Sequence, residues 1–182
     1  MRTVLVVCIL VLVPALLPGQ AEAQDRSRLT GAFDPQEVVT ELVASWKRDD
    51  VRRYMDCLAD SFLFVPDLSA RIAYPEVDWP RYGLGRERAF FDATRGSLEL
   101  VEILEKGLEV RNQAAWEVIY RLRTSEGSSV GRATFIFAEI EQRWYLLQWI
   151  DTAAEQDPDT KQQLPTSGHL RGRPWVQSLR ER

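Results

Sequence analysis

The sequence predicts an α+β fold, with helices in the first part of the chain and a long antiparallel sheet in the last part. Residues 34–58 carry apolar side chains at helical spacing, behind two helix-capping signals. Residues 98–152 instead alternate along their length between short turns, as paired strands do. The two halves are therefore expected to pack against each other.

Two neighbouring helices are predicted first. Asp34 can cap the first helix, Pro35 suits its first position, and Glu37 can reach back to the Asp34 amide as in a capping box. Asp49-Asp50 caps a second, shorter helix, and the short link implies that the two helices pack together. The inward stripe comprises Val38, Val39, Leu42, Val43, Trp46, Val51, Tyr54, Met55 and Leu58.

A brief strand follows at Phe62–Val65 and ends at Pro66-Asp67. Residues 68–83 are predicted to be irregular because prolines interrupt them. This loop carries three large aromatic side chains, Tyr74, Trp79 and Tyr82. A short helix then starts near Gly85 and carries Phe90 and Phe91.

Residues 130–152 predict a long hairpin around which the rest of the chain is organised. With Glu141-Gln142 as a two-residue loop, Phe137 faces Leu146 and Ala133 faces Ile150. The loop lacks the Gly or Asn that such hairpins prefer, so a longer loop is an alternative.

The strand before this hairpin is predicted at residues 114–124, which place alternate apolar side chains on one face. If residues 126–129 form the turn, Tyr120 meets Phe135 and Val118 meets Phe137. The inward faces of all three strands then agree, which supports the sheet.

The first 23 residues are predicted to be a secretory signal peptide. Arg2 precedes an apolar run at residues 4–17, and Ala21-Glu22-Ala23 offers a cleavage site. The run is short for a membrane span, so a retained anchor is the lesser alternative. We expect an exported protein, secreted or periplasmic, with a leader at residues 24–33 and one domain at residues 34–152.

Composition excludes several classes of site. The formal net charge is −4, which gives no footprint for nucleic acid. Cys57 would be the single cysteine after signal cleavage, and we interpret it as a buried filler. No histidine lies between Asp34 and Thr152, which argues against a His-ligated metal. We expect no metal and no other cofactor.

The order of these elements resembles the nuclear transport factor 2-like superfamily over residues 34–152. The resemblance rests on five short segments: SWKRDD at 45–50, LADSF at 58–62, GRE at 85–87, GRATF at 131–135 and RWYL at 143–146. It implies a cone, also described as a cystatin-like α+β barrel, in which a strongly curved antiparallel sheet wraps around the N-terminal helices. A pocket would open between sheet and helix.

That superfamily includes ketosteroid isomerases and SnoaL-like cyclases together with non-catalytic binders, but its catalytic residues do not carry over. Leu42 stands at the position of the isomerase tyrosine and Pro66 at that of the base. Ala133 stands near the oxyanion aspartate, and Ile150 replaces a histidine common in SnoaL-like members. The resemblance therefore favours a non-catalytic protein.

We expect the cone to bind a small apolar or aromatic ligand, because its predicted lining is aromatic with few polar groups. Tyr120 and Gln148 either point at that ligand or hydrogen-bond within the core. Tyr54 is either part of the site or simple packing. The predicted lining is Tyr54, Phe64, Asp67, Tyr74, Trp79, Phe90, Trp116, Tyr120, Phe135 and Gln148.

The alternative is an isomerase, cyclase or dehydratase. In that hypothesis Asp67 is the general base and Tyr120 or Tyr54 donates a hydrogen bond. The competing interpretation of Asp67 is ordinary turn chemistry after a strand, and it is the stronger of the two.

A third hypothesis is a homodimer through the outward face of the sheet. The predicted register lines up Ile119, Ile136 and Leu147 across three strands, extended by Tyr145 and Trp149. Exposed apolar rows of this kind mark interfaces. We interpret residues 153–182 as a mobile polar and basic tail; the alternative is that the tail folds back over this outward row and covers it, with Trp175 as the covering side chain.

Overall fold

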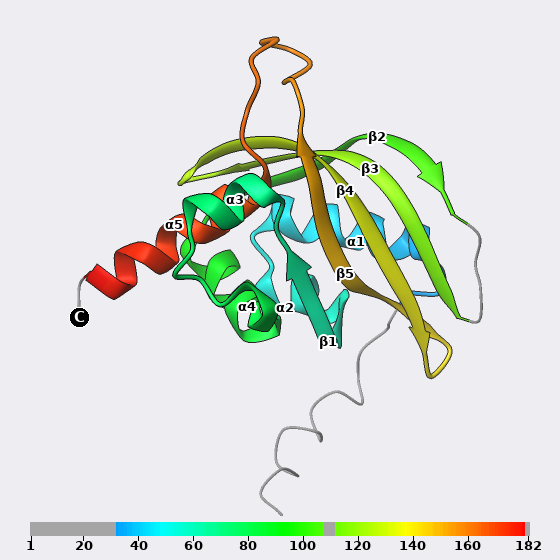
Figure 1. Cartoon of the computed structure of the whole chain (residues 1–182). Helices are drawn as coiled ribbons and strands as arrows, with labels where there is room; N and C mark the ends of the chain where they lie inside the picture. Colours follow the sequence, from blue (N-terminus) through cyan, green and yellow to red (C-terminus); the bar gives the residue numbers. More distant parts are fainter. Residues whose placement is uncertain (1–31, 108–111, 181–182) are drawn as a thin grey trace, which may run out of the picture. The chain divides into compact units, whose positions relative to one another are not determined.

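The computed structural model describes residues 32–107 and 112–180, without the side chains of residues 174–180. One sheet runs in the order β1-β5-β4-β3-β2 (Figure 1). Its strands are β1 (Leu58–Val65), β2 (Gly96–Lys106), β3 (Gln113–Thr124), β4 (Gly127–Ile140) and β5 (Arg143–Ala154). The helices are α1 (Pro35–Arg48), α2 (Val51–Asp56), α3 (Leu68–Ala73), the 3-10 turn η2 (Trp79–Arg81), α4 (Leu84–Ala93) and α5 (Ser167–Arg180).

The predicted α+β class with a curved sheet around N-terminal helices is confirmed, but the sheet is mixed. Strands β2 to β5 pair antiparallel, as predicted. The first strand, β1, pairs parallel with β5, so that Phe64 lies beside Trp149. Alternation within a strand does not reveal its neighbour, which is why the sequence did not predict this pairing.

The capping signals explain where the first two helices begin. The Asp34 carboxylate accepts the Glu37 amide hydrogen at 2.8 Å, and the Asp50 carboxylate accepts that of Arg53 at 3.0 Å. The Glu37 carboxylate accepts from the Phe33 amide, one residue before the predicted donor. Both predicted helix starts are confirmed.

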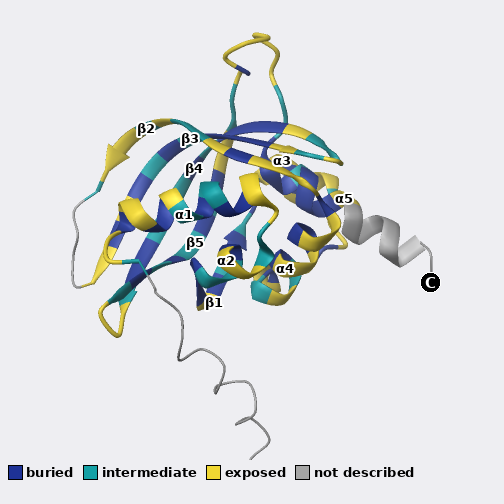
Figure 2. Ribbon diagram, turned by 180° about the vertical axis from the view of Figure 1, so that it is seen from behind, coloured by how far each residue is buried: buried dark blue, intermediate teal, exposed yellow. Residues whose placement is uncertain are grey.

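The core lies between the helices and the face of the sheet that they cover. Buried residues recur along β3 and β4, as the dark blue bands on their ribbons show in Figure 2. Trp46 of α1 packs on Phe91 of α4 with ring centroids 4.4 Å apart, and Tyr54 of α2 stacks on the same ring at 4.6 Å. Phe137 and Leu146 close this core from the sheet.

A bulge in β5 changes the predicted register of the central hairpin. The two-residue loop is confirmed: Ile140 pairs with Arg143, and Glu141 and Gln142 both have positive φ, 51° and 62°. Phe137 also pairs with Leu146 as predicted. The register then shifts, since Ile136 pairs with Gln148 and Leu147 is the extra residue.

The bulge reverses the faces of the residues that follow it. Trp149 and Asp151 turn inward and are buried, whereas Gln148 and Ile150 are only partly buried. The prediction that Trp149 belongs to an outward dimer row is therefore wrong. Gln148, predicted to line the interior, pairs with Ile136 on the opposite face. A one-residue slip moves the following side chains to the other face, here as far as Asp151, after which the register shifts again at Thr152.

The turn between β3 and β4 is shorter than predicted. Thr124 pairs with Gly127, so Ser125 and Glu126 form the loop. Tyr120 therefore faces Gly131, and Val118 faces Ala133. The displacement is an even number of residues, so the inward faces were predicted correctly although the partners were not.

The structure differs in part from the mobile tail predicted for residues 153–182: residues 158–163 are exposed, but the segment that follows them is packed against the fold. Thr166, Ser167, Leu170 and Arg171 are all buried. The alternative, a tail that folds back over the outward row, is not what is observed: α5 docks beside α3 and in the interior, and Ile119, Ile136 and Leu147 stay partly exposed. The side chain of Trp175 lies outside the described residues. The predicted signal peptide and leader also lie outside them, apart from Ala32 and Phe33. No helix in the described ranges combines the length and apolarity needed to cross a bilayer.

Candidate functional site

Most of the predicted lining residues do meet in the interior. Seven of them are at most 7% exposed: Tyr54, Phe64, Trp79, Phe90, Trp116, Tyr120 and Phe135. Asp67 and Tyr74 are partly buried at α3, beside the start of α5. The interior also holds charged residues that the sequence analysis did not assign to it.

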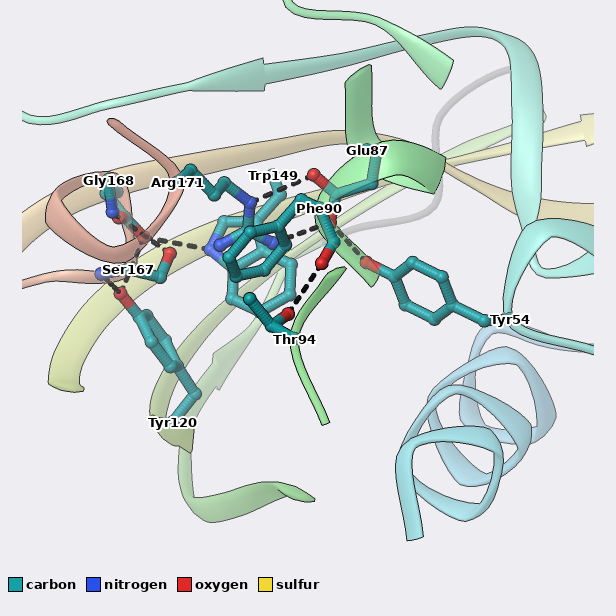
Figure 3. Close-up of polar contacts among 10 residues, drawn as sticks. Tyr54, Glu87, Phe90, Thr94, Tyr120, Trp149, Ser167, Gly168 and Arg171 are labelled. Atoms are coloured by element: carbon teal, nitrogen blue, oxygen red, sulfur yellow. Dashed lines mark hydrogen bonds and ion pairs between the residues drawn. The ribbon is translucent and has the colours of Figure 1, made fainter. Parts of the chain in front are cut away.

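One buried carboxylate, Asp151, receives four hydrogen bonds. Its Oδ1 accepts from the Tyr120 hydroxyl and the Trp149 indole N–H, each at 2.8 Å. Its Oδ2 accepts from the Ser167 hydroxyl at 2.9 Å and the Gly168 amide at 3.0 Å. The Ser167 amide also donates to the Tyr120 oxygen at 2.7 Å, so the first turn of α5 is bound to the sheet (Figure 3).

A second buried carboxylate, Glu87 of α4, binds the guanidinium of Arg171 through two parallel contacts. Arg171 Nε donates to Glu87 Oε2 at 2.9 Å, and its Nη2 donates to Oε1 at 2.7 Å. The Tyr54 hydroxyl donates to the same Oε1 (Figure 3). Both side chains of the ion pair are 0% exposed.

Three aromatic rings surround the Arg171 guanidinium. Its carbon lies 4.2 Å from the ring centroid of Phe64, 4.6 Å from that of Trp149 and 4.9 Å from that of Phe90. These distances are within the range of cation–π attraction. Arg171 Nη1 has no hydrogen-bond acceptor among the described residues. We call Glu87, Phe64, Phe90 and Trp149 the cation cage.

Burial sets the protonation of these groups. Burial raises the pKa of Asp151. The charge of Arg171 and the hydrogen bonds that Asp151 accepts lower this pKa, but by less. Burial, and secondarily a neighbouring carboxylate, raises the pKa of Tyr54 and of Tyr120, so both phenols stay protonated at neutral pH. For Arg171, burial would lower the pKa, but Glu87 more than offsets it and the pKa is raised.

The predicted general base, Asp67, is the N-cap of α3. Its Oδ1 accepts from the Ala70 amide at 2.9 Å and from the Thr166 hydroxyl at 3.2 Å. Its Oδ2 accepts from Ser69 at 2.8 Å. The described contacts join neither tyrosine hydroxyl to Asp67, because Tyr54 binds Glu87 and Tyr120 binds Asp151. The turn interpretation of Asp67 accounts for its contacts with Ser69 and Ala70, and the contact with Thr166 adds a link to the segment before α5.

The close approach of α5 depends on glycine. A methyl group on Gly168 would come within 2.8 Å of the Ala70 Cβ and 3.0 Å of the Pro66 Cβ. A methyl group on Gly172 would come within 2.4 Å of the Tyr74 ring. The α5 segment reaches this position from β5 through residues 155–166, which project as a loop beyond the end of β5 (Figure 1).

Sequence reasoning missed the residues that give the interior its charge. Glu87 lies in the GRE segment at 85–87, for which the sequence predicts no buried charge, and Arg171 lies in the predicted basic tail. The described ranges contain no cluster of three or more His, Cys, Asp or Glu side chains suited to a metal ion. Within the described residues, the space between the rings and the Glu87 carboxylate is filled by the Arg171 guanidinium.

No protein-family model matches the chain, and no curated protein sequence matches it. Solved structures do resemble it. An NTF2-like protein of unknown function from Shewanella oneidensis aligns with 64% of this chain and 94% of its own, at 15% identity and a TM-score of 0.51. A protein named as a candidate aromatic ring hydroxylase from Novosphingobium aromaticivorans aligns with 74% and 92%, at 15% identity and a TM-score of 0.50. The order of strands and helices and these likenesses together give the conclusion that this chain has the nuclear transport factor 2-like fold.

Proposed function

We propose that the protein is an exported, non-catalytic domain that binds a small molecule with an apolar or aromatic body in the interior between the helices and the sheet. The observation that carries the proposal is the convergence of three aromatic rings on one buried cation, Arg171, with the buried carboxylates of Glu87 and Asp151 in the same interior. Mostly apolar linings with a few placed polar groups are typical of ligand sites.

In this proposal α5 closes the site. Its first turns supply Ser167, Gly168 and Arg171, which occupy the polar groups of the interior. A ligand would enter when this helix detaches. Local opening of a short docked segment costs less free energy than global unfolding.

The proposal is tested with the full chain and a Gly168→Ala variant, whose added methyl group weakens the docking of α5. We would measure thermal stability of both proteins against a panel of hydrophobic and aromatic metabolites. A ligand should stabilise the variant more than the wild type, because less of its binding free energy is spent on opening. If no compound stabilises either protein, the ligand-binding proposal fails.

Export is tested by fusing residues 1–30 to a reporter that is active only outside the cytoplasm. The apolar run and its small-residue cleavage site support the prediction. An inactive reporter would contradict it.

The outward face of the sheet supports a second proposal, a homodimer, on a corrected set of residues. Ile119, Ile136, Tyr145 and Leu147 remain partly exposed, and the bulge adds Ile150 to the same face. Trp149 is excluded by its burial. Sedimentation at micromolar concentration should show a dimer that Ile136→Glu converts to a monomer; a monomeric wild-type protein would contradict this.

A further inference from the structure

The Arg171 guanidinium occupies a site built by other parts of the chain. Glu87 and Phe90 come from α4, Phe64 from β1, and Trp149 from β5. The Tyr54 hydroxyl of α2 donates a hydrogen bond to the Glu87 carboxylate. All of these elements lie between residues 51 and 154, whereas the cation itself arrives on a helix that follows a separate connecting segment.

The cation cage is complementary to a planar cation rather than to a neutral group. Its carboxylate accepts two parallel N–H donors at 2.9 and 2.7 Å. Its three rings lie within 5 Å of the guanidinium carbon. A fork of donors and an aromatic face are the two features by which a guanidinium is recognised.

Without α5, the cation cage would contain the negative charge of Glu87 but no cation to balance it. Glu87 would lose its two charged donors while keeping the hydroxyl of Tyr54, and Asp151 would lose the donors of Ser167 and Gly168. A buried carboxylate without a counter-charge is strongly unfavourable. A neutral apolar ligand cannot replace what α5 supplies.

We propose that the interior takes an organic cation, with a guanidinium or alkylammonium head in the cation cage and an apolar body along the aromatic lining. Arg171 is then a stand-in for the ligand's head group. This inference rests on the proposed ligand-binding function and narrows it to one chemical class. It adds a positively charged head group to the small apolar or aromatic ligand expected from the sequence.

The first test uses the full chain with Arg171→Ala, which keeps the Ser167 and Gly168 contacts and leaves a space of guanidinium size. Ethylguanidinium should raise its melting temperature and bind at least about tenfold more tightly than ethylurea, because hydrogen bonds to charged groups contribute more. Arg171→Met, which refills the space with an uncharged chain, is the matched control and should not respond. Adding Glu87→Gln to Arg171→Ala should remove the preference for the cation.

If Arg171→Ala proves to be unfolded, its refolding by the added compound becomes the readout. Ethylguanidinium, and not ethylurea, should then restore its far-ultraviolet circular dichroism, since binding stabilises the folded state. Equal effects of the two compounds, or no effect of ethylguanidinium, overturn the inference.

A second comparison separates this inference from the proposed function. Gly168→Ala is titrated with phenethylammonium and with neutral phenethyl alcohol. Tighter binding of the cation supports the inference. Equal binding of both compounds overturns it but leaves ligand binding intact, and no binding of either overturns both.

Discussion

The hydroxyl of Tyr120 on β3 reaches across β4 to the carboxylate of Asp151 on β5, 2.8 Å away. The phenol passes over Gly131 on β4, the pairing partner of Tyr120. A side chain there would collide with the phenol, because its Cβ would lie 2.6 Å from the Tyr120 oxygen. The absence of a side chain at one position thus allows the link between two strands that are not neighbours.

Gly131→Ala should therefore destabilise the protein by about 1–3 kcal/mol, the usual cost of overpacking a core. Urea denaturation measures the change. Gly85→Ala is the matched control, since no atom lies within 4 Å of its added methyl group. The control should be neutral or stabilising by up to about 1 kcal/mol; equal losses in both variants would contradict the role of Gly131.

Stability should depend on pH through Asp151. Its folded-state pKa is raised above the usual 3.8, so the folded protein binds this proton more tightly than the unfolded chain. The resulting stabilisation is present below the unfolded pKa and is lost as pH rises through the folded pKa. The stability of the wild type minus that of Asp151→Asn should therefore fall from acid pH toward neutral pH. Denaturation curves across this range test it, and a difference that rises with pH would contradict it.

The buried pair of Arg171 and Glu87 should show strong coupling. Arg171→Met leaves Glu87 buried without its cation and should cost about 3–5 kcal/mol. Adding Glu87→Gln removes the uncompensated charge, so the double variant should be more stable than Arg171→Met alone. A double-mutant cycle by urea denaturation measures the coupling. Strict additivity would mean that the two groups do not interact.

Cys57 should be unreactive in the folded protein. Its side chain is buried, and burial raises the pKa of the thiol to about 12. Almost no thiolate is then present at pH 8, and the thiolate is the nucleophile. Labelling with a thiol reagent should proceed only as fast as the protein opens, and should become rapid in denaturant. Rapid labelling without denaturant would contradict this burial.

Local signals in the sequence predicted the local structure well. Asp34, Asp50 and the Glu141-Gln142 turn each act through neighbours in the chain, and each was predicted in place. The bulge at Leu147 could not be predicted in this way. Gln148 and Ile150 share one face of the strand, and Trp149 and Asp151 share the other. Each face thus receives one apolar and one polar side chain in either register, so alternation does not favour one register over the other.

The sequence did not predict the buried charged residues for a related reason. Glu87 lies on a short helix without a clear apolar face, and its partner Arg171 is 84 residues further along the chain. Contacts at such separations leave no periodic signal. Arg171 lies in a segment rich in arginine, where a solvated tail is the usual interpretation. Only the fold brings these two side chains together.

The central claim is that α5 closes the interior through Ser167, Gly168 and Arg171, and hydrogen exchange tests it most directly. Exchange followed by mass spectrometry should show that the amides of residues 167–171 are protected in the wild-type protein. They should lose this protection in Gly168→Ala, while β3, β4 and α1 keep theirs and Gly85→Ala behaves as wild type. Rapid exchange of residues 167–171 in the wild-type protein would contradict the account.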